Sequence, residues 1–173
     1  MKYSIHGPFK IIRVKKTGLI DRDKAAKKSF WNMVGKEVSS SCGCYLFAIQ
    51  AAKGIKPWYI GLAAKQSFEK ECFTPQKINI YNEVLASGSG TPLLFLVAKR
   101  TNKGKIVKPS KNGHKKDIIF LETMLIATAR EKNRKLKNKM KTKYLRKMIV
   151  PGLINTPRGK QSNPESEFKK AIK

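Results

Sequence analysis

Two tyrosines in this sequence stand where their hydroxyl groups could take part in proton transfer. Tyr45 and Tyr59 lie fourteen residues apart, each beside a glycine, in the strings GCY at 43–45 and YIG at 59–61. A phenol both donates and accepts hydrogen bonds, and its ionised form is a base. Taken singly, each tyrosine would more often be a core packing residue, so the pair gains meaning only from its surroundings.

Glu122 is the second feature that could carry chemistry, because it is the only charged residue in the twelve residues from Ile118 to Ala129. Burying an unpaired carboxylate is costly, so this side chain is predicted to face a cleft, a cation or a metal ion. A solvated helix face is the alternative, since Thr123 and Thr128 also interrupt the apolar surface.

The composition indicates an anionic partner. Lysine and arginine number 38 against 11 aspartates and glutamates, which gives a net charge of +27 spread over the whole chain. Such a field attracts polyanions, and neutralising phosphates releases counterions, so nucleic acid is the expected partner. Two alternatives rest on charge alone: a basic protein that coats nucleic acid without chemistry, and a partner of acidic proteins or of ribosome assembly.

Other classes of protein fit the sequence less well. The longest apolar stretch, 118–129, falls short of the ~20 residues that a membrane-spanning helix needs, so no membrane partner is expected. The first residues lack the apolar core of a secretory signal, which predicts a cytoplasmic location. The three cysteines and two histidines are not clustered as zinc ligands are.

Several elements must position these residues. Strands are predicted over 43–49, 58–62 and 92–98, and a turn at Lys53-Gly54 joins the first two into an antiparallel hairpin. Alternating apolar and basic residues at 9–15 predict a further edge strand.

Helices are predicted between and after these strands. The first runs from Asp21 to Val34, stops at Gly35, and should bury Ala26, Phe30, Met33 and Val34. Three more are expected from Pro75 to Leu85, from Asp117 to Arg130, and after Asn163. The lysine-rich loop from Thr101 to Lys116 separates the last strand from the Glu122 helix.

The paired GCY and YIG strings on a hairpin, followed by a helix, a strand and a helix that carries a glutamate, resemble the GIY-YIG nuclease family. The resemblance covers residues 42–138. It implies an α+β fold in which helices flank a small antiparallel sheet of about three strands. The 173 residues are then expected to form a single domain, with basic extensions at 1–41 and 139–173.

The resemblance also implies the catalytic residues. The family carries a cation on the helix after YIG, followed four positions later by tyrosine or histidine, and Lys77 and Tyr81 match this pair. Lysine here replaces the usual arginine, which is not a conservative exchange at a phosphate. Glu122 matches the family's metal-binding glutamate, so Mg²⁺, or another divalent cation such as Mn²⁺, is the expected cofactor. Tyr45 or Tyr81 is expected to act as the base, with Tyr59 orienting the water.

Further residues are expected to bind the nucleic-acid backbone or to support the site. Lys65 follows YIG a few positions later than the lysine that many relatives carry there, and it is expected to bind phosphate. Asn138 resembles the terminal asparagine of the family pattern, which would brace the site by hydrogen bonding; an asparagine that ends the helix is an equally good interpretation. The supporting residues are Gly43, Gly61 and Asn138. The expected nucleic-acid contacts are Lys65, Lys70, Lys111, His114, Lys115 and Lys116.

The function expected from the sequence is therefore that of a metal-dependent endonuclease that hydrolyses phosphodiester bonds. Double-stranded DNA is the expected substrate. The alternative is a non-catalytic basic protein that binds nucleic acid on a degenerate GIY-YIG scaffold. The sequence leaves open the choice between DNA and RNA, the cognate site, the biological role and the oligomeric state.

Overall fold

The computed structural model describes residues 1–111, 115–138, 149, 159 and 162–172. The chain divides into two compact units, Met1–Asn138 and Lys139–Lys173. The second unit contains helix α7, Asn163–Ile172, which begins where the Asn-Pro-Glu sequence predicts a helix. Within the described residues, no helix is both long and apolar enough to cross a membrane.

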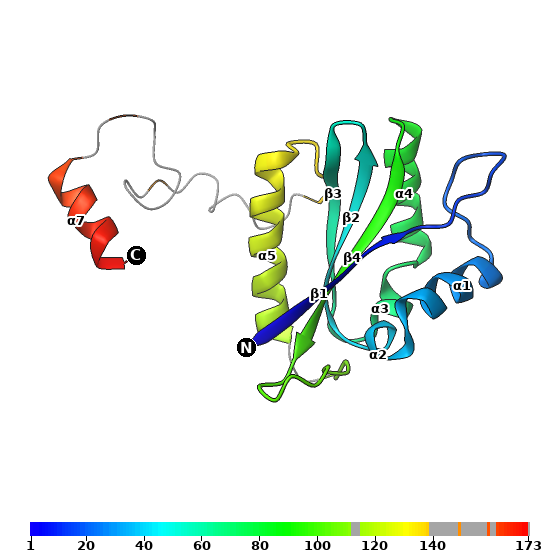
Figure 1. Ribbon diagram of the computed structural model, residues 1–173, viewed down its shortest axis with the longest axis horizontal. Helices are drawn as coiled ribbons and strands as arrows, with labels where there is room; N and C mark the ends of the chain where they lie inside the picture. Colours follow the sequence, from blue (N-terminus) through cyan, green and yellow to red (C-terminus); the bar gives the residue numbers. More distant parts are fainter. Residues whose placement is uncertain (112–114, 139–148, 150–158, 160–161, 173) are drawn as a thin grey trace. The chain divides into compact units, whose positions relative to one another are not determined.

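A four-stranded antiparallel sheet forms the centre of the first unit (Figure 1). Its strands are β1 (Lys2–Lys10), β2 (Gly43–Ala51), β3 (Gly54–Ala63) and β4 (Thr91–Arg100). Their order across the sheet is β1-β4-β2-β3. The α+β class is confirmed, but the sheet has four strands rather than about three.

The additional strand comes from the segment expected to be an N-terminal extension. β1 pairs along β4 from Lys2 to Lys10, so the edge strand expected at 9–15 begins earlier and ends at Lys10. The prediction was wrong because an edge strand with mostly exposed side chains needs no apolar alternation. Arg13, which was placed in that strand, instead forms an isolated bridge with Ile20.

The hairpin of β2 and β3 is confirmed. Tyr45 lies opposite Gly61 and Phe47 lies opposite Tyr59, so all four positions share one face of the sheet. The register shifts after Phe47, and the resulting bulge leaves Trp58 without an opposite residue.

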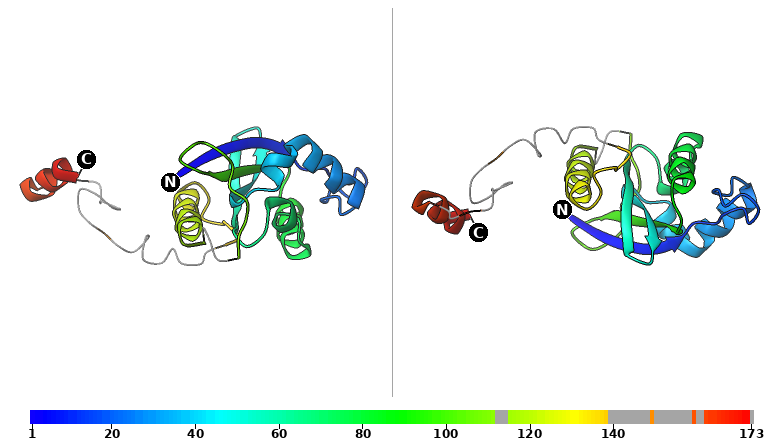
Figure 2. Two further views of the ribbon diagram at one scale, coloured as in Figure 1. Left: turned by 90° about the horizontal axis from the view of Figure 1, so that it is seen from below. Right: turned by 90° about the horizontal axis from the view of Figure 1, so that it is seen from above.

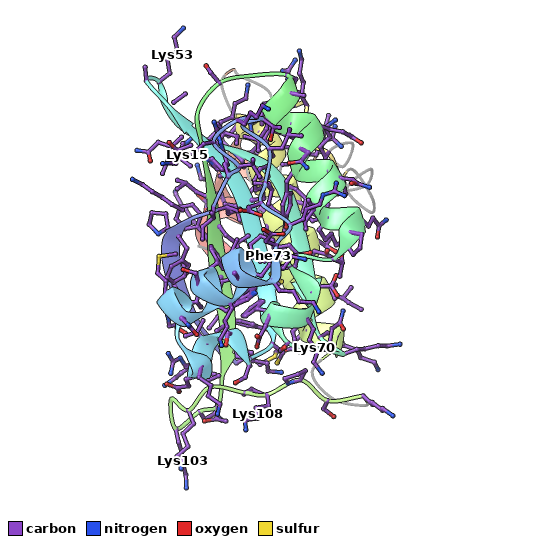
Figure 3. All side chains as sticks on the ribbon, turned by 90° about the vertical axis from the view of Figure 1, so that its right-hand side faces the viewer. Lys15, Lys53, Lys70, Phe73, Lys103 and Lys108 are labelled. Atoms are coloured by element: carbon purple, nitrogen blue, oxygen red, sulfur yellow. The ribbon has the colours of Figure 1, made fainter. Side chains whose placement is uncertain are left out.

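Helices cover both faces of the sheet (Figure 2). One face carries α1 (Lys24–Val34), α2 (Lys36–Ser39), α3 (Phe68–Glu71) and α4 (Pro75–Ala86). Figure 3 shows α1, α2 and α4 in front of the sheet and α5 (Lys115–Lys132) behind it. The predicted helices at Pro75 and Asp117 are therefore confirmed within one or two residues.

The main core lies between the sheet and α1 to α4. Edge-to-face aromatic contacts fix α1 there, with ring centroids of Phe30 5.0 Å from both Trp31 and Phe73. Phe30 and Val34 are buried as predicted, but Met33 is 53 % exposed and Trp31 takes the core position instead. The prediction for Met33 was wrong because α1 is rotated so that the indole of Trp31 packs against Phe73.

The N-terminal end of α5 is tied to the sheet through one carboxylate. Asp117 Oδ2 lies 2.6 Å from Lys99 Nζ of β4 and accepts a 2.8 Å hydrogen bond from the hydroxyl of Tyr3 in β1. Burial alone would raise the pKa of Asp117, but the hydrogen bonds from Lys99 and Tyr3 lower the pKa below its usual value. This contact fixes the start of the helix that carries Glu122.

Replacing Asp117 by asparagine should lower the free energy of unfolding by about 1–3 kcal/mol at pH 7, because a mostly buried ammonium loses its charged partner. The lowered pKa means that the carboxylate stabilises the fold above its unfolded pKa of ~3.9 and loses this effect as pH falls through the folded value. Urea denaturation at pH 7 and at pH 3 measures both effects.

The exposed Asp23, whose side chain does not cap α1, provides the control variant Asp23→Asn. The variant with Asp117→Asn should approach the stability of the wild type as pH falls. An equal deficit at both pH values would contradict the role assigned to this ion pair.

Candidate functional site

A cleft of about 530 Å³ opens at the edge of the sheet formed by β3, between α3 and α4 on one face and α5 on the other. It gathers residues far apart in the sequence, because β3 pairs with β2 and α5 crosses behind both strands. The residues that line it are Tyr59, Leu62, Ala64, Lys65, Gln66, Glu71, Lys77 and Glu122. Four of these, Tyr59, Lys65, Lys77 and Glu122, were predicted from the sequence.

The closest polar contact in the cleft joins Lys77 to Tyr59. Lys77 Nζ donates a 2.7 Å hydrogen bond to the hydroxyl oxygen of Tyr59 and lies 5.0 Å from the centroid of its ring. The ammonium thus lies beside the oxygen on which negative charge would form if Tyr59 lost its proton. The helical position of Lys77, in the first turn of α4, aims its side chain at β3.

Two residues that sequence reasoning missed hold Lys77 in place. Glu71 Oε1 lies 3.9 Å from Lys77 Nζ, and Glu71 Oε2 accepts a 2.5 Å hydrogen bond from Gln66 Nε2. The side chains of Lys77 and Glu71 are 15 % and 21 % exposed, so water screens this contact only in part. Glu71 is the last residue of the short helix α3, and Gln66 lies just before that helix begins.

Glu122 is half-buried on α5 and lines the cleft. The hydroxyl groups of Thr123 and Thr128 donate to the carbonyl oxygens of Ile119 and Met124, so these threonines are satisfied within the helix. Of the three polar residues in the apolar stretch, Glu122 is the one that lines the cleft.

Tyr45 and Tyr81 lie beneath the cleft rather than in its wall, and both are fully buried. Tyr81 stacks on Phe47 with ring centroids 4.1 Å apart, and Tyr59 lies between the other two tyrosines at 6.1 and 6.2 Å. Among the described residues neither buried hydroxyl makes a hydrogen bond of ordinary geometry, although the Tyr45 hydroxyl lies close enough to that of Tyr81 to lower the pKa of Tyr81 in part. Burial raises the pKa of both phenols well above the usual value, so each is held neutral.

The two glycines of the motif make room for these strands. A methyl group at Gly61 would overlap the ring and the hydroxyl of Tyr45 on the neighbouring strand. One at Gly43 would overlap the backbone carbonyl of Val97 in β4, and the φ of +152° at Gly43 also disfavours other residues. The requirement for glycine at both positions is therefore steric.

The segment after α5 is bonded to the exposed edge of β3. Asn138 accepts a 3.2 Å hydrogen bond from the Ile60 amide and donates to the Ile60 carbonyl. Asn133 Nδ2 donates to the Pro57 carbonyl at 2.6 Å, and the Lys137 amide donates to the Trp58 carbonyl at 2.8 Å. Asn138 thus braces the strand that carries Tyr59.

The remaining predicted contacts are distributed around the first unit. Lys65 lines the cleft, and Lys70 on α3 is exposed. Lys111 is exposed in the lysine-rich loop and Lys116 is exposed in the first turn of α5, while His114 and the side chain of Lys115 lie outside the described residues. Of the four of these side chains that the structure describes, only Lys65 lies with Tyr59 and Glu122 at the cleft.

The donor set is compatible with a magnesium ion that is shared with a phosphate. Mg²⁺ is commonly bound by one or two carboxylates while waters and substrate oxygens fill the other positions, and Glu122 supplies one carboxylate at the cleft. No cluster of three or more aspartate, glutamate, histidine or cysteine side chains with metal-binding geometry occurs among the described residues. The described residues thus offer no cage made of protein ligands alone.

Comparison of the chain with protein-family models, with curated proteins and with solved structures finds no match.

Substituting alanine for Gly61 should destabilise the protein by about 1–3 kcal/mol, because the new methyl group can be accommodated only if the buried ring of Tyr45 moves. Thermal unfolding measures the loss. The matched control is Gly88→Ala, where nothing lies within 4 Å of the added methyl group and the stability should change by less than about 0.5 kcal/mol. Equal melting temperatures for both variants would contradict the packing described here.

Proposed function

We propose that this chain is a metal-dependent endonuclease that hydrolyses phosphodiester bonds in nucleic acid, with DNA the first substrate to test. The observation that carries the proposal is the hydrogen bond from Lys77 to Tyr59 in a cleft that also contains Glu122. A phosphodiester hydrolase needs a proton acceptor for water and positive charge near the phosphate. The net charge of +27 supports a polyanionic substrate.

Tyr59 is assigned as the base in this proposal, in place of Tyr45 or Tyr81. Its hydroxyl oxygen lies at the cleft beside an ammonium group, whereas the other two phenols are buried and held neutral. Lys77 would offset the charge of a Tyr59 phenolate as that oxygen accepts the proton of the attacking water. Tyr45 and Tyr81 then act by packing, since their rings hold Tyr59 at its position.

The other polar residues of the cleft would bind the phosphate, orient Lys77 and hold the cation. Lys65 would hold a non-bridging oxygen of the phosphate, and Glu71 with Gln66 would keep Lys77 aimed at Tyr59. Glu122 would hold the divalent cation, which supplies Lewis-acid stabilisation of the charge that develops on the phosphate and the leaving oxygen.

The second candidate function is nucleic-acid binding without cleavage. Lys77 favours it in one respect, because an ammonium that already contacts Tyr59 and Glu71 offers the phosphate a single point charge rather than the two-pronged contact of a guanidinium. Binding that needs no divalent cation and leaves the strand intact would establish this function.

The first test incubates supercoiled plasmid with the purified protein in Mg²⁺ and in chelator. The wild type should nick or linearise the plasmid only with Mg²⁺, and Glu122→Ala should reduce the rate by at least about 10²-fold while the gel shift of DNA with chelator persists. The control is Glu131→Ala, an exposed carboxylate on the same helix, which should cleave as the wild type does. Intact plasmid that is nonetheless shifted would refute the nuclease and support the second function.

The assignment of the base is tested by two tyrosine variants. Tyr59→Phe should lower the cleavage rate by about 10²–10⁴-fold, because it removes the oxygen that accepts the proton. Tyr45→Phe removes a buried hydroxyl that makes no hydrogen bond of ordinary geometry among the described residues, so it should keep activity and leave stability equal or slightly higher. Plasmid nicking and thermal unfolding are measured on both, and loss of activity in Tyr45→Phe with Tyr59→Phe active would reverse the assignment.

A further inference from the structure

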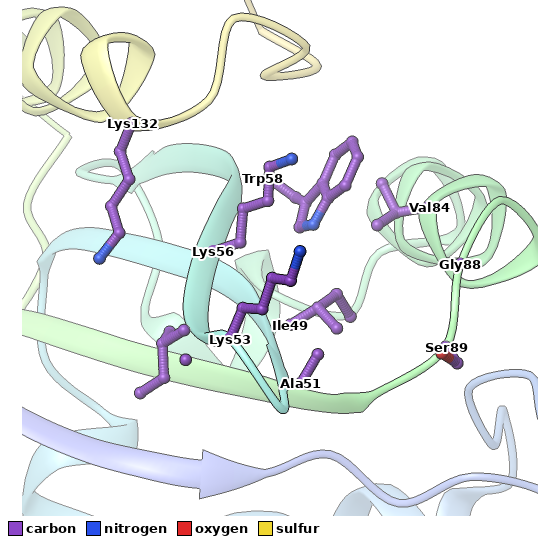
Figure 4. Close-up of a pocket in the computed structure, with 11 residues that line it drawn as sticks. Ile49, Ala51, Lys53, Lys56, Trp58, Val84, Gly88, Ser89 and Lys132 are labelled. Atoms are coloured by element: carbon purple, nitrogen blue, oxygen red, sulfur yellow. The ribbon is translucent and has the colours of Figure 1, made fainter.

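A second cavity, of about 370 Å³, lies at the turn end of the hairpin, next to the bulge in β3 (Figure 4). Its wall is apolar where Ile49, Trp58 and Val84 contribute, and Lys53, Lys56 and Lys132 also line it. Figure 4 shows the indole of Trp58 between Lys56 and Val84 of α4. None of these residues belongs to the cleft that contains Tyr59 and Glu122.

Trp58 is placed in this cavity by the bulge. It has no opposite residue on β2, and hydrogen bonds from Lys137 and Asn133 hold the backbone carbonyls of Trp58 and Pro57 from the outer side. The indole is half-buried against the core, with Lys56 Nζ 5.3 Å from its ring centroid. A large aromatic side chain is thus held in position, partly open to solvent, and next to cations.

The cleft and the cavity lie at different ends of α4: Lys77 in its first turn lines the cleft, and Val84 in its last turn lines the cavity. Lys77 and Val84 are seven residues apart on one face of this helix, a distance of roughly 10 Å, which is about three stacked nucleotides of a single strand. A strand that leaves the cleft along α4 would pass the exposed ion pair of Lys137 with Glu83 and reach Trp58 a few nucleotides from the phosphate at Tyr59.

We infer that this cavity binds one unpaired nucleobase, stacked on Trp58 in the place that the Lys56 ammonium takes over its ring, while the displaced Lys56 and Lys53 contact the flanking phosphates. An aromatic ring beside basic side chains is the combination that retains single-stranded nucleic acid, since every base has a face that can stack. In a fully paired duplex both faces of each base are covered, so the cavity selects substrates with a single-stranded segment, such as a flap, a gap or a bubble. The inference rests on the proposed binding of nucleic acid, but not on cleavage.

The experiment measures affinity and tryptophan fluorescence with a single-stranded oligothymidine, an oligouridine, an abasic strand of equal length and a blunt duplex. The chain has two tryptophans, and Trp31 is buried in the core, so Trp58→Phe leaves an internal reference for emission. Oligothymidine or oligouridine should quench the wild type in a saturable manner, the abasic strand and the duplex much less, and either strand should leave Trp58→Phe nearly unquenched. A comparison of oligouridine with oligodeoxyuridine, which differ only in the 2′-hydroxyl group, identifies the preferred sugar.

Trp58→Ala should weaken single-strand binding by about 5- to 100-fold, while Trp58→Phe, which keeps an aromatic face, should weaken it by less than about 5-fold. The control variant is Phe120→Ala, which removes an exposed aromatic residue of α5 outside the cavity and should leave the affinity unchanged. Equal quenching by the abasic strand, or equal losses in Trp58→Ala and Phe120→Ala, would overturn the base-binding cavity. Failure of the wild type to bind any of these ligands would instead overturn the proposed function itself.

Discussion

The close approach of Tyr45 to Gly61 is the constraint on which the site depends. The ring of Tyr45 lies across the neighbouring strand directly against Gly61, so no side chain larger than hydrogen fits at position 61. This contact fixes the register of the hairpin. The same register places Tyr59 on the face that α4 covers, where Lys77 reaches it. A shift of one residue would turn Tyr59 toward α5 and separate it from its cation.

Although the chain is strongly basic, two lysines that fix elements of the site are each paired with a carboxylate. Only 11 carboxylates accompany 38 basic residues, and two of them are engaged by largely buried lysines: Glu71 at the cleft and Asp117 at the start of α5. Each fixes an element that carries a candidate catalytic residue. The field of the molecule attracts a polyanion, while these few ion pairs determine where the reactive groups lie.

The sequence predicted the elements that have an internal apolar pattern and missed those whose neighbours define them. The hairpin, α4 and α5 follow from periodicity and caps, and the motif located Tyr59, Lys77 and Glu122. The sequence did not reveal β1, whose exposed basic side chains resemble a loop, nor the bulge that isolates Trp58. Gln66 and Glu71 were missed because their role depends on the position of Lys77, and the burial of Tyr45 and Tyr81 depends on α4 packing over Phe47.

The hydrogen bonds that Asn133, Lys137 and Asn138 make to β3 have a consequence for association between molecules. An edge strand of ten residues offers unpaired amides and carbonyls to any other extended chain, and this is how sheets join or aggregate. Here residues 133–138 form hydrogen bonds with the backbone groups of Pro57, Trp58 and Ile60, so another strand cannot pair with this part of β3. The opposite edge, β1, carries Pro8 and lysines at both ends, and like charge opposes the pairing of two such edges.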